Sequence, residues 1–160
     1  MALKLTSRAF RDESTIPEKH SKNGGNISPG LEWTGVPEGT KSLALIVDDP
    51  DAPSGTFVHW LVYGIPPTAS ELREDMPNTQ MLPNGARQGR NDFGEIGYGG
   101  PQPPSGVHRY FFHLYALDYE PSLRAGASRE EVDRAIDGHA IEDADLMGRY
   151  QQREPGMRAA

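Results

Sequence analysis

The sequence predicts an all-β fold with a minor helix, arranged as a mostly antiparallel β-sandwich. Three stretches have the composition of strands, and helix signals are clear in only one segment, near the C-terminus. Long connections rich in glycine and proline separate these elements. The 160 residues include 18 Gly and 14 Pro. That share lies above average usage but below the roughly 25–30% that marks disordered chains. With 36% hydrophobic residues the chain can bury a core, so we expect a single domain over residues 1–160.

The three strand candidates have the composition of buried strands. Residues 42–47 (Ser-Leu-Ala-Leu-Ile-Val) form a continuous apolar run, which is typical of a strand covered on both faces. Residues 57–65 are rich in aromatic and β-branched residues and end at a Pro-Pro pair. Along residues 107–117, His108 and Tyr110 would share one face, and the opposite face is also largely apolar. This last strand is therefore expected in the middle of a layered structure.

The predicted helix starts at a capping box. Ser128 and Glu131 have the spacing at which each side chain bonds the backbone N–H of the other, and Gly138 is placed as a stop. Residues 140–150 are ambiguous between a second helix and a final strand. The alternation of their apolar residues favours the strand.

Composition excludes several classes of protein. The chain has no cysteine, which removes disulfides, thiolate nucleophiles and cysteine-ligated metal sites. A net charge of −7 argues against a nucleic-acid-binding protein, because such affinity comes from Lys and Arg on phosphates. The N-terminus shows no secretory signal, and no apolar run approaches the roughly 18 residues of a membrane span. We therefore expect a cytoplasmic protein without a transmembrane segment.

Glycine and proline concentrate in one connection. Twelve of them lie in residues 77–106, between the second and the third strand candidate. So long a connection without secondary structure is uncommon in a compact domain and is more often functional than not. The alternative is a rigid crossover between the two sheets.

Three polar clusters occupy apolar or conformationally restricted positions. Asp49 and Asp51 lie on a proline-bound turn directly after the first strand candidate, where they would either cap backbone N–H groups or serve a site. His59 lies inside an apolar strand, where a lone histidine is more often a hydrogen-bonded core residue than a ligand. His108 and Tyr110 enter the third strand from the glycine-rich connection, at the rim of the sandwich. Each cluster alone also fits a purely structural role.

Together these residues allow several kinds of site. Two histidines with carboxylates could ligate a metal ion. A hydrolase would pair a nucleophile with a base, but Ser105, near His108, lacks the Gly-x-Ser-x-Gly context of a nucleophile elbow. The glycine-rich segment also lacks the Gly-Lys-Ser/Thr ending of a P-loop. An anion pocket remains, because imidazole, phenol and loop N–H groups all donate to phosphate-like oxygens. Asp49 would then orient a histidine or bind a cationic part of the ligand.

The three clusters together resemble those of the phosphatidylethanolamine-binding protein family, which includes the Raf kinase inhibitor proteins and the plant flowering regulators. The resemblance covers nearly the whole chain, from about residue 3 to residue 150, and is closest to the prokaryotic Raf-kinase-inhibitor-like branch. The motifs that carry it are Asp49-Pro-Asp-Ala-Pro53, His59-Trp60 and residues 99–110 (Gly-Gly-Pro-Gln-Pro-Pro-Ser-Gly-Val-His-Arg-Tyr), extended by Asn26-Ile-Ser-Pro29, Trp33, residues 39–45 and Asn91-Asp-Phe-Gly94.

The resemblance implies a β-sandwich with a large antiparallel sheet, a smaller sheet, a C-terminal helix and a small anion pocket at one end. It also implies a cis peptide bond between Ala52 and Pro53, and ligands of the phosphate or phosphoethanolamine type. The prokaryotic branch implies a homodimer, and the inhibitors in the family imply a kinase or protease as protein partner. The pocket residues carried over by motif position are Asp49, Asp51, His59, Gly100, Pro101, His108 and Tyr110.

We therefore predict a non-enzymatic, regulatory binding protein without a metal or another cofactor. Its pocket would take a phosphorylated small molecule or a phosphorylated group of a partner, and the lack of an activated nucleophile favours binding over catalysis. The alternative is a small hydrolase in which Asp49 acts with His59 or His108 on a phosphorylated substrate. A third possibility treats all three clusters as fold-stabilising only.

Overall fold

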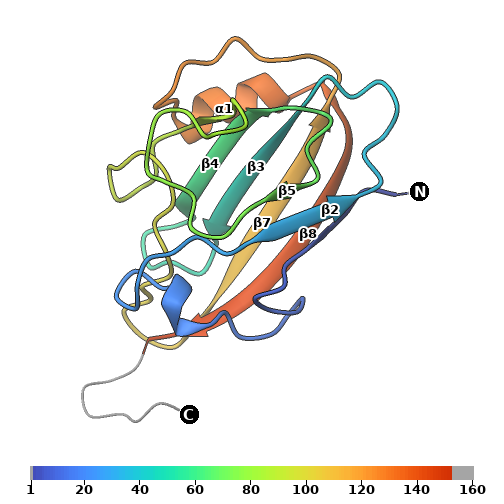
Figure 1. Ribbon diagram of the computed structural model, residues 1–160. Coiled ribbons are helices and arrows are strands. Elements are labelled where there is room, and N and C mark those ends of the chain that lie inside the picture. The colour runs from blue at the N-terminus through green and yellow to red at the C-terminus, as the bar shows by residue number, and fades with distance from the viewer. Residues whose placement is uncertain (1, 153–160) are drawn as a thin grey trace.

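The computed structural model describes residues 2–152, which form two β-sheets and one α-helix (Figure 1). Pairing between neighbouring strands is antiparallel in both sheets. The small sheet has the order β1-β2-β5, with β1 at Lys4–Thr6, β2 at Leu31–Thr34 and β5 at Glu71–Leu72. The large sheet has the order β6-β4-β3-β7-β8, with β6 at Arg87–Gln88, β4 at Phe57–Ile65, β3 at Ser42–Asp49, β7 at Val107–Leu117 and β8 at Ala140–Gln151. A 3-10 turn, η1, spans Glu18–His20, and α1 spans Arg129–Ile136.

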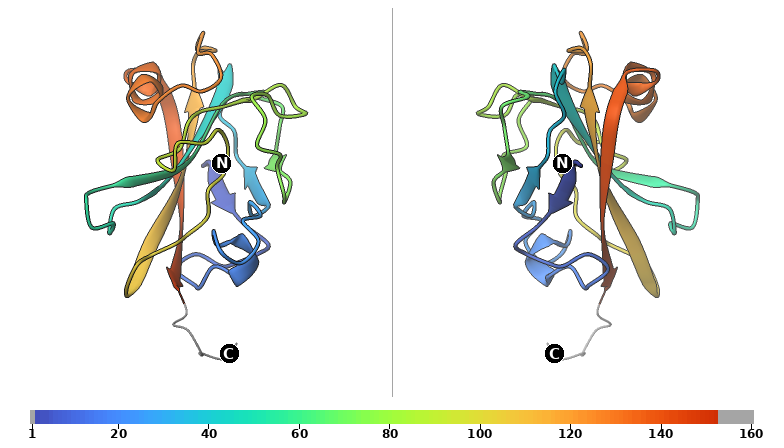
Figure 2. Two further views of the ribbon diagram at one scale, coloured as in Figure 1. Left: turned by 90° about the vertical axis from the view of Figure 1, so that its left-hand side faces the viewer. Right: turned by 90° about the vertical axis from the view of Figure 1, so that its right-hand side faces the viewer.

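The two sheets pack face to face, and α1 covers part of the outer face of the large sheet (Figure 2). The core between the sheets includes Leu5, Trp33, Leu45, Trp60, Phe112 and Leu114. A second buried cluster lies beneath α1 and includes Ala44, Ile46, Leu61, Tyr63, Val132 and Ile136. The central strand β3 is therefore covered on both faces, as its continuous apolar run predicts. Within residues 2–152, no helix has the length and apolar character that a membrane span requires.

The predicted sandwich, strands and helix are confirmed. β4 and β7 have the predicted bounds, and β3 continues two residues beyond the predicted run, to Asp49. The capping box is present, since the Ser128 hydroxyl accepts from Glu131 N and the Glu131 carboxylate accepts from Ser128 N. The ambiguous segment at residues 140–150 is a strand, β8, paired along most of its length with β7.

The four shortest strands were missing from the sequence-based prediction. β1, β2, β5 and β6 have two to four residues each, too few to produce a periodic pattern. Their conformation depends on pairing with a neighbour far away in sequence, as in the β6–β4 pairing of Arg87 with Tyr63. Tertiary context therefore decides these elements.

A buried carboxylate joins α1 to the large sheet. Asp48, near the end of β3, accepts from Arg129 Nη1 at 2.9 Å and lies 3.3 Å from His113 Nε2. His113 Nδ1 in turn bonds Asp145 of β8 at 2.8 Å. Burial alone would lower the pKa of His113, but the hydrogen bonds to the two carboxylates outweigh it and raise this pKa above 6.5. The imidazolium form of His113 therefore stabilises the fold.

We expect the His113→Gln variant to be destabilised in a pH-dependent way. Because the pKa of His113 is raised by folding, its contribution is fully present below pH 6.5 and is lost as pH rises through the raised value. The free energy of unfolding of the variant should be about 1 kcal/mol lower than that of the wild type at about pH 5.5, and the difference should be smaller at about pH 9. Urea unfolding at both pH values measures this difference, with His139→Gln as the matched control. A wild-type-to-variant difference that stays constant between the two pH values would contradict the assignment.

Candidate functional site

Three strand ends meet at one end of the large sheet. Because β3 runs antiparallel to both β4 and β7, its last residues lie beside the first residues of these neighbours. Asp49 ends β3, His59 is the third residue of β4 and His108 is the second residue of β7. All three line one cavity of about 520 Å³, a size typical of ligand sites. The rest of its lining consists of Ala52, Pro53, Ser54, Gly55, Thr56, Phe57, Asp92, Phe93, Gln102, Pro103 and Pro104.

A β-bulge directs His59 toward the inner face of the sheet. The pairings of Val47 and Asp48 with β4 skip one residue, and that residue is His59. Trp60 packs in the core between the sheets, so strict alternation would turn His59 to the outer face. Instead its ring lies against the inner-face ring of Tyr110, with centroids 5.1 Å apart. The bulge thus brings His59 to the same cavity as His108, a use of bulges that is common beside functional sites.

Asp49 and His108 form a buried hydrogen-bonded pair. His108 Nδ1 donates to Asp49 Oδ2 at 2.6 Å, and the two residues are only 7% and 3% exposed. The second carboxylate oxygen, Oδ1, accepts from the backbone N–H of Asp51 at 2.8 Å. Both contacts fix the carboxylate, and the carboxylate fixes the imidazole. Nε2 is then the ring nitrogen of His108 that remains for a ligand.

His59 is held by a neutral partner. Its Nδ1 donates to the carbonyl of Gly99 at 2.6 Å, and the N–H of Gly99 donates to the carbonyl of His59 at 2.9 Å. Burial lowers the pKa of His59 and outweighs the opposite effects of the Gly99 hydrogen bond and the Asp49 charge. Neutral His59 presents the lone pair of Nε2 to the cavity. Three aromatic rings surround the imidazole, with centroids no more than 5.6 Å away: Phe57, Phe93 and Tyr110.

Gly100 and Pro101 support the cavity from behind. The N–H of Gly100 donates to Asn26 Oδ1 at 2.7 Å, and the carbonyl of Pro101 accepts from the N–H of Lys22 at 2.9 Å. A Cβ atom at Gly100 would lie 2.2 Å from the carbonyl oxygen of His20. Both residues were expected to line the pocket, but neither is part of its lining. The N–H of Gly100 is already used, so it holds the loop in place and is not free for an anion.

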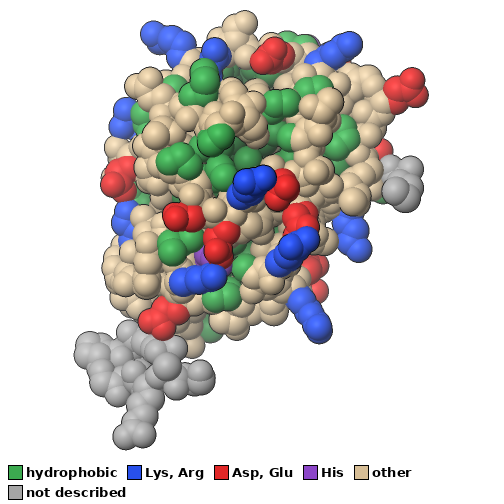
Figure 3. Space-filling model, viewed as in Figure 1, with side chains coloured by type: hydrophobic (Ala, Val, Ile, Leu, Met, Phe, Trp, Pro, Cys, Tyr) green, Lys and Arg blue, Asp and Glu red, His purple; other side chains and the backbone are tan. Residues whose placement is uncertain are grey.

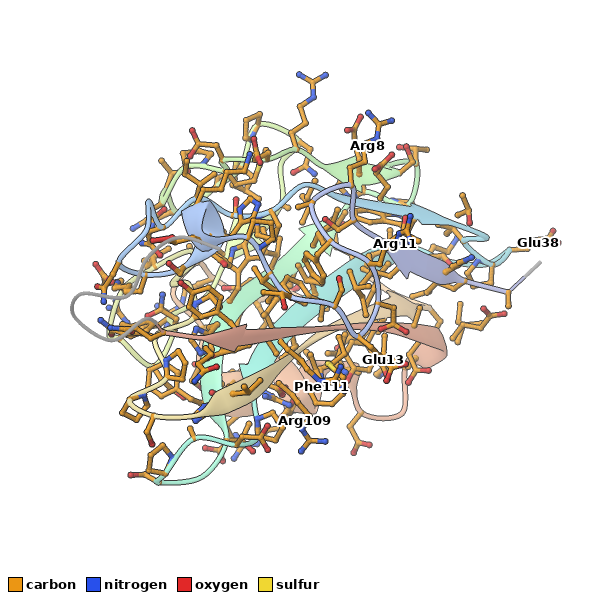
Figure 4. All side chains as sticks on the ribbon, turned by 90° about the horizontal axis from the view of Figure 1, so that it is seen from below. Arg8, Arg11, Glu13, Glu38, Arg109 and Phe111 are labelled. Atoms are coloured by element: carbon orange, nitrogen blue, oxygen red, sulfur yellow. The ribbon has the colours of Figure 1, made fainter. Side chains whose placement is uncertain are left out.

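Asp51 also lies outside the cavity lining. Its carboxylate accepts from the backbone N–H, Nε and Nη2 of Arg109 at 2.8–2.9 Å, and these hydrogen bonds lower the pKa of Asp51 to about 2. Arg109 and its neighbour Phe111 project from β7 on the side opposite to Arg8 (Figure 4). Asp51 therefore fastens the β3–β4 turn to the outer face of the sheet, while Asp49 serves the inner face.

Tyr110 packs behind His59 and is almost completely buried. Its hydroxyl is buried without a hydrogen-bond partner in the described residues. Burial and the nearby charge of Asp49 both raise the pKa of Tyr110, so the phenol is neutral. The predicted pocket residue thus contributes a wall for the imidazole of His59 and an unused donor close to Asp49.

The turn after β3 corrects one expectation. The peptide bonds in residues 2–152 are all trans, including the bond between Ala52 and Pro53, which the family resemblance implied to be cis. Two hydrogen bonds close this turn with a trans proline: Asp51 N–H to Asp49 Oδ1, and Gly55 N–H to the Ala52 carbonyl. The Asx-type contact and the site role of Asp49 are therefore compatible, because one carboxylate oxygen serves each.

Sequence reasoning missed the lining contributed by Asp92 and Phe93. These residues belong to the Asn91-Asp-Phe-Gly94 motif, which extended the family resemblance but received no role. Asn91 is buried and its Oδ1 accepts from the N–H groups of Phe93 and Glu95, which shapes a tight turn. Asp92 Oδ2 accepts from the N–H of Val58, which attaches that turn to β4 beside the bulge. The motif was visible, but its position over the cavity depends on tertiary pairing.

The charges around the cavity are mainly acidic. Asp49 and Asp92 line it, and its lining includes neither Lys nor Arg. The nearby Lys22 lies over the ring of Phe93, with Nζ 4.3 Å from the ring centroid, and pairs with Glu95 at 2.7 Å. In residues 2–152, no group of three or more His, Asp or Glu is arranged to hold a metal ion.

A second cavity, of about 490 Å³, lies beside the small sheet and offers less for a ligand. Acidic and basic side chains are interspersed on the face that Figure 3 shows. Among the residues that line this cavity, Arg8 pairs with Glu32 and Lys19 pairs with Glu74, so opposite charges neutralise each other. The cavity at the strand ends is therefore the better candidate site.

This fold and cavity define a β-sandwich protein with a ligand-sized site at one end of its larger sheet. The family model described as phosphatidylethanolamine-binding protein matches residues 6–151. The chain therefore belongs to the phosphatidylethanolamine-binding protein family.

Similar proteins come from archaea and bacteria. A UPF0098 protein of Methanothermobacter thermautotrophicus is 51% identical over 150 residues, which cover 94% of this chain and 99% of the relative. A UPF0098 protein of Aquifex aeolicus is 47% identical, covering 94% of this chain and 89% of the relative. Crystal structures of a phosphatidylethanolamine-binding protein homologue from Chlamydia trachomatis and of Escherichia coli YbcL superpose with TM-scores of 0.87 and 0.89. The Chlamydia trachomatis protein is 44% identical, and the match covers 95% of this chain and 99% of that one. The Escherichia coli protein is 36% identical, and the match covers 96% of this chain and 100% of that one.

We expect Gly100→Ala to destabilise the protein because the new methyl group would collide with the backbone of His20. Relieving a backbone contact of 2.2 Å requires the loop to move, and the cost should be roughly 1–3 kcal/mol. Gly30→Ala is the matched control, since a Cβ there would find its nearest neighbour at 3.4 Å. Denaturant unfolding of both variants measures the difference. Equal stability losses would show that the close approach at Gly100 is not needed.

Proposed function

We propose that this protein binds a small oxyanion, of the phosphate or phosphomonoester type, in the cavity formed by Asp49, His59 and His108. The observation that carries the proposal is the orientation of the two imidazoles. Each has its Nδ1 fixed by a protein acceptor, which leaves both Nε2 atoms for a ligand in the same cavity. Imidazoles held in this way are preorganised, so little rotamer entropy is lost on binding.

The charge of the Asp49–His108 pair supports an anionic ligand. A protonated His108 is balanced by the carboxylate of Asp49, and its Nε2–H can then make a charge-assisted hydrogen bond to a phosphate oxygen. Ser54 and Thr56 also line the cavity, and their side chains carry hydroxyl groups that can donate. The phosphorylated group can belong to a small molecule or to a partner. Inhibition of a kinase or protease, a homodimer and a cytoplasmic location stay predictions from the resemblance and from composition.

A hydrolase is the second candidate, and the Asp49–His108 hydrogen bond favours it. A buried carboxylate that orients a histidine is the arrangement of a general base in many hydrolases. Such a base also needs a nucleophile within reach. In the described residues, neither Ser54 nor Thr56 is hydrogen-bonded to an imidazole, so an attacking group would have to be water. Binding without turnover is the function that the site supports better.

Calorimetric titration with phosphate and with phosphoethanolamine tests the proposal. We expect His108→Ala to weaken binding by about tenfold or more, because the ligand loses a charge-assisted hydrogen bond. His139→Ala is the matched control, since His139 pairs with Asp118 away from the cavity. Equally weak heats for the wild type and His108→Ala would refute the proposal. Turnover of phosphomonoesters that is lost in Asp49→Asn would establish the hydrolase instead.

A further inference from the structure

The two histidines of the cavity have partners of different charge. His108 Nδ1 donates to the carboxylate of Asp49, whereas His59 Nδ1 donates to the carbonyl of Gly99. Both rings therefore carry a proton on Nδ1 and have Nε2 available for the ligand. Whether Nε2 donates or accepts depends on the second proton of each ring, and the partner decides how easily the ring holds it.

His108 is the ring whose contact partner carries a negative charge. The carboxylate in contact with it balances the imidazolium charge, so the Asp49–His108 pair is neutral as a whole. An oxyanion that approaches Nε2 adds a second negative partner for the same ring. Its Nε2–H is then the donor of the site.

His59 is the ring that stays neutral. The group in contact with its Nδ1 is an uncharged carbonyl, and three aromatic rings surround it. Other polar or charged groups also face the His59 ring. They are Asp49 on β3, Asp92 on the connection between β6 and β7, and His108 and Tyr110 on β7. The attraction of Asp49 and Asp92 for an imidazolium is smaller than the cost of burying one, so Nε2 keeps its lone pair and accepts.

The net charge of the lining has the same consequence. With the Asp49–His108 pair neutral, the carboxylate of Asp92 remains in the lining, which contains neither Lys nor Arg, so an anion with a charge of −2 meets more repulsion than one with −1. An oxyanion that retains a proton carries one negative charge fewer. It also has the O–H donor that His59 Nε2 requires.

We propose that the cavity selects oxyanions that carry a proton, such as the monoanion of a phosphomonoester, over oxyanions of the same shape that carry none. His59 is the specificity-determining residue, because its Nε2 accepts the O–H of the ligand while His108 donates to an ionised oxygen. A ligand without that proton brings one lone pair against another and leaves a buried acceptor unsatisfied. This inference rests on the proposed function, since it presupposes that the cavity binds oxyanions.

Methyl phosphate and methyl sulfate form a matched pair for the test. At about pH 5, about one pH unit below the second pKa of a phosphomonoester, most of the methyl phosphate is the monoanion. The two ligands then share shape and a charge of about −1, and differ in the proton. We expect methyl phosphate to bind the full chain at least about tenfold more tightly than methyl sulfate in calorimetric titration. The comparison uses the wild-type protein alone, so it does not depend on the folding of any variant.

The His59→Asn variant assigns the selectivity to one atom. Asparagine can place an amide N–H near the position of His59 Nδ1 and keep the bond to Gly99, but it has no atom at the position of Nε2. We expect the methyl phosphate to methyl sulfate affinity ratio to fall toward one in this variant. His139→Asn carries the same substitution outside the cavity lining and should retain the wild-type ratio.

The outcomes separate this inference from the proposed function. A wild type that binds methyl sulfate as tightly as methyl phosphate overturns the inference and leaves oxyanion binding intact. A wild type that binds neither ligand removes the proposed function as well. A preference for methyl phosphate that persists in a folded His59→Asn variant contradicts the role of His59.

Discussion

The end of β3 carries two consecutive carboxylates on opposite faces of the large sheet, and the architecture on each face depends on one of them. Asp48 points outward and binds His113 and Arg129, which fixes the first turn of α1 over the second hydrophobic cluster. Asp49 points inward and orients His108 at the cavity. Both carboxylates are buried, so each needs its cationic or hydrogen-bonding partner to offset the cost of desolvation. Because successive side chains of a strand point to opposite faces, the consecutive residues Asp48 and Asp49 contact different parts of the structure.

The elements with a strong local signal could be predicted from the sequence. β3, β4 and β7 combine length with apolar composition, and α1 has a complete capping box, so their bounds came out within about two residues. For β8, only the alternation of its apolar residues favoured a strand over a helix. The structure explains this alternation, because β8 pairs with β7 along most of its length. The short strands carry no such signal. Their conformation depends on pairing with distant segments of the chain, which cannot be recognised from a short stretch of sequence.

The candidate site was predictable in its residue types but not in its geometry. Asp49, His59 and His108 do line one cavity, whereas Asp51, Gly100, Pro101 and Tyr110 surround it as supports. Alternation alone would place His59 on the wrong face, because nothing in the sequence marks the bulge beside Asp48. The concentration of glycine in residues 97–106 also has a physical reason. A Cβ at Gly99 would lie 2.4 Å from Phe93, so only glycine lets the loop approach both the aromatic wall and the His59 ring.

The proposed binding function depends on the different partners of the two imidazoles. A hydrolytic base has to change its protonation state during each turnover, and its surroundings must tolerate both forms. His59 is buried against a carbonyl and aromatic rings, which penalise the charged form. His108 is paired with the Asp49 carboxylate, which is itself bonded to the turn through Asp51 N–H and has little freedom to adapt. In the proposed function, the two rings would hold an oxyanion, one as donor and one as acceptor, without any transfer of a proton.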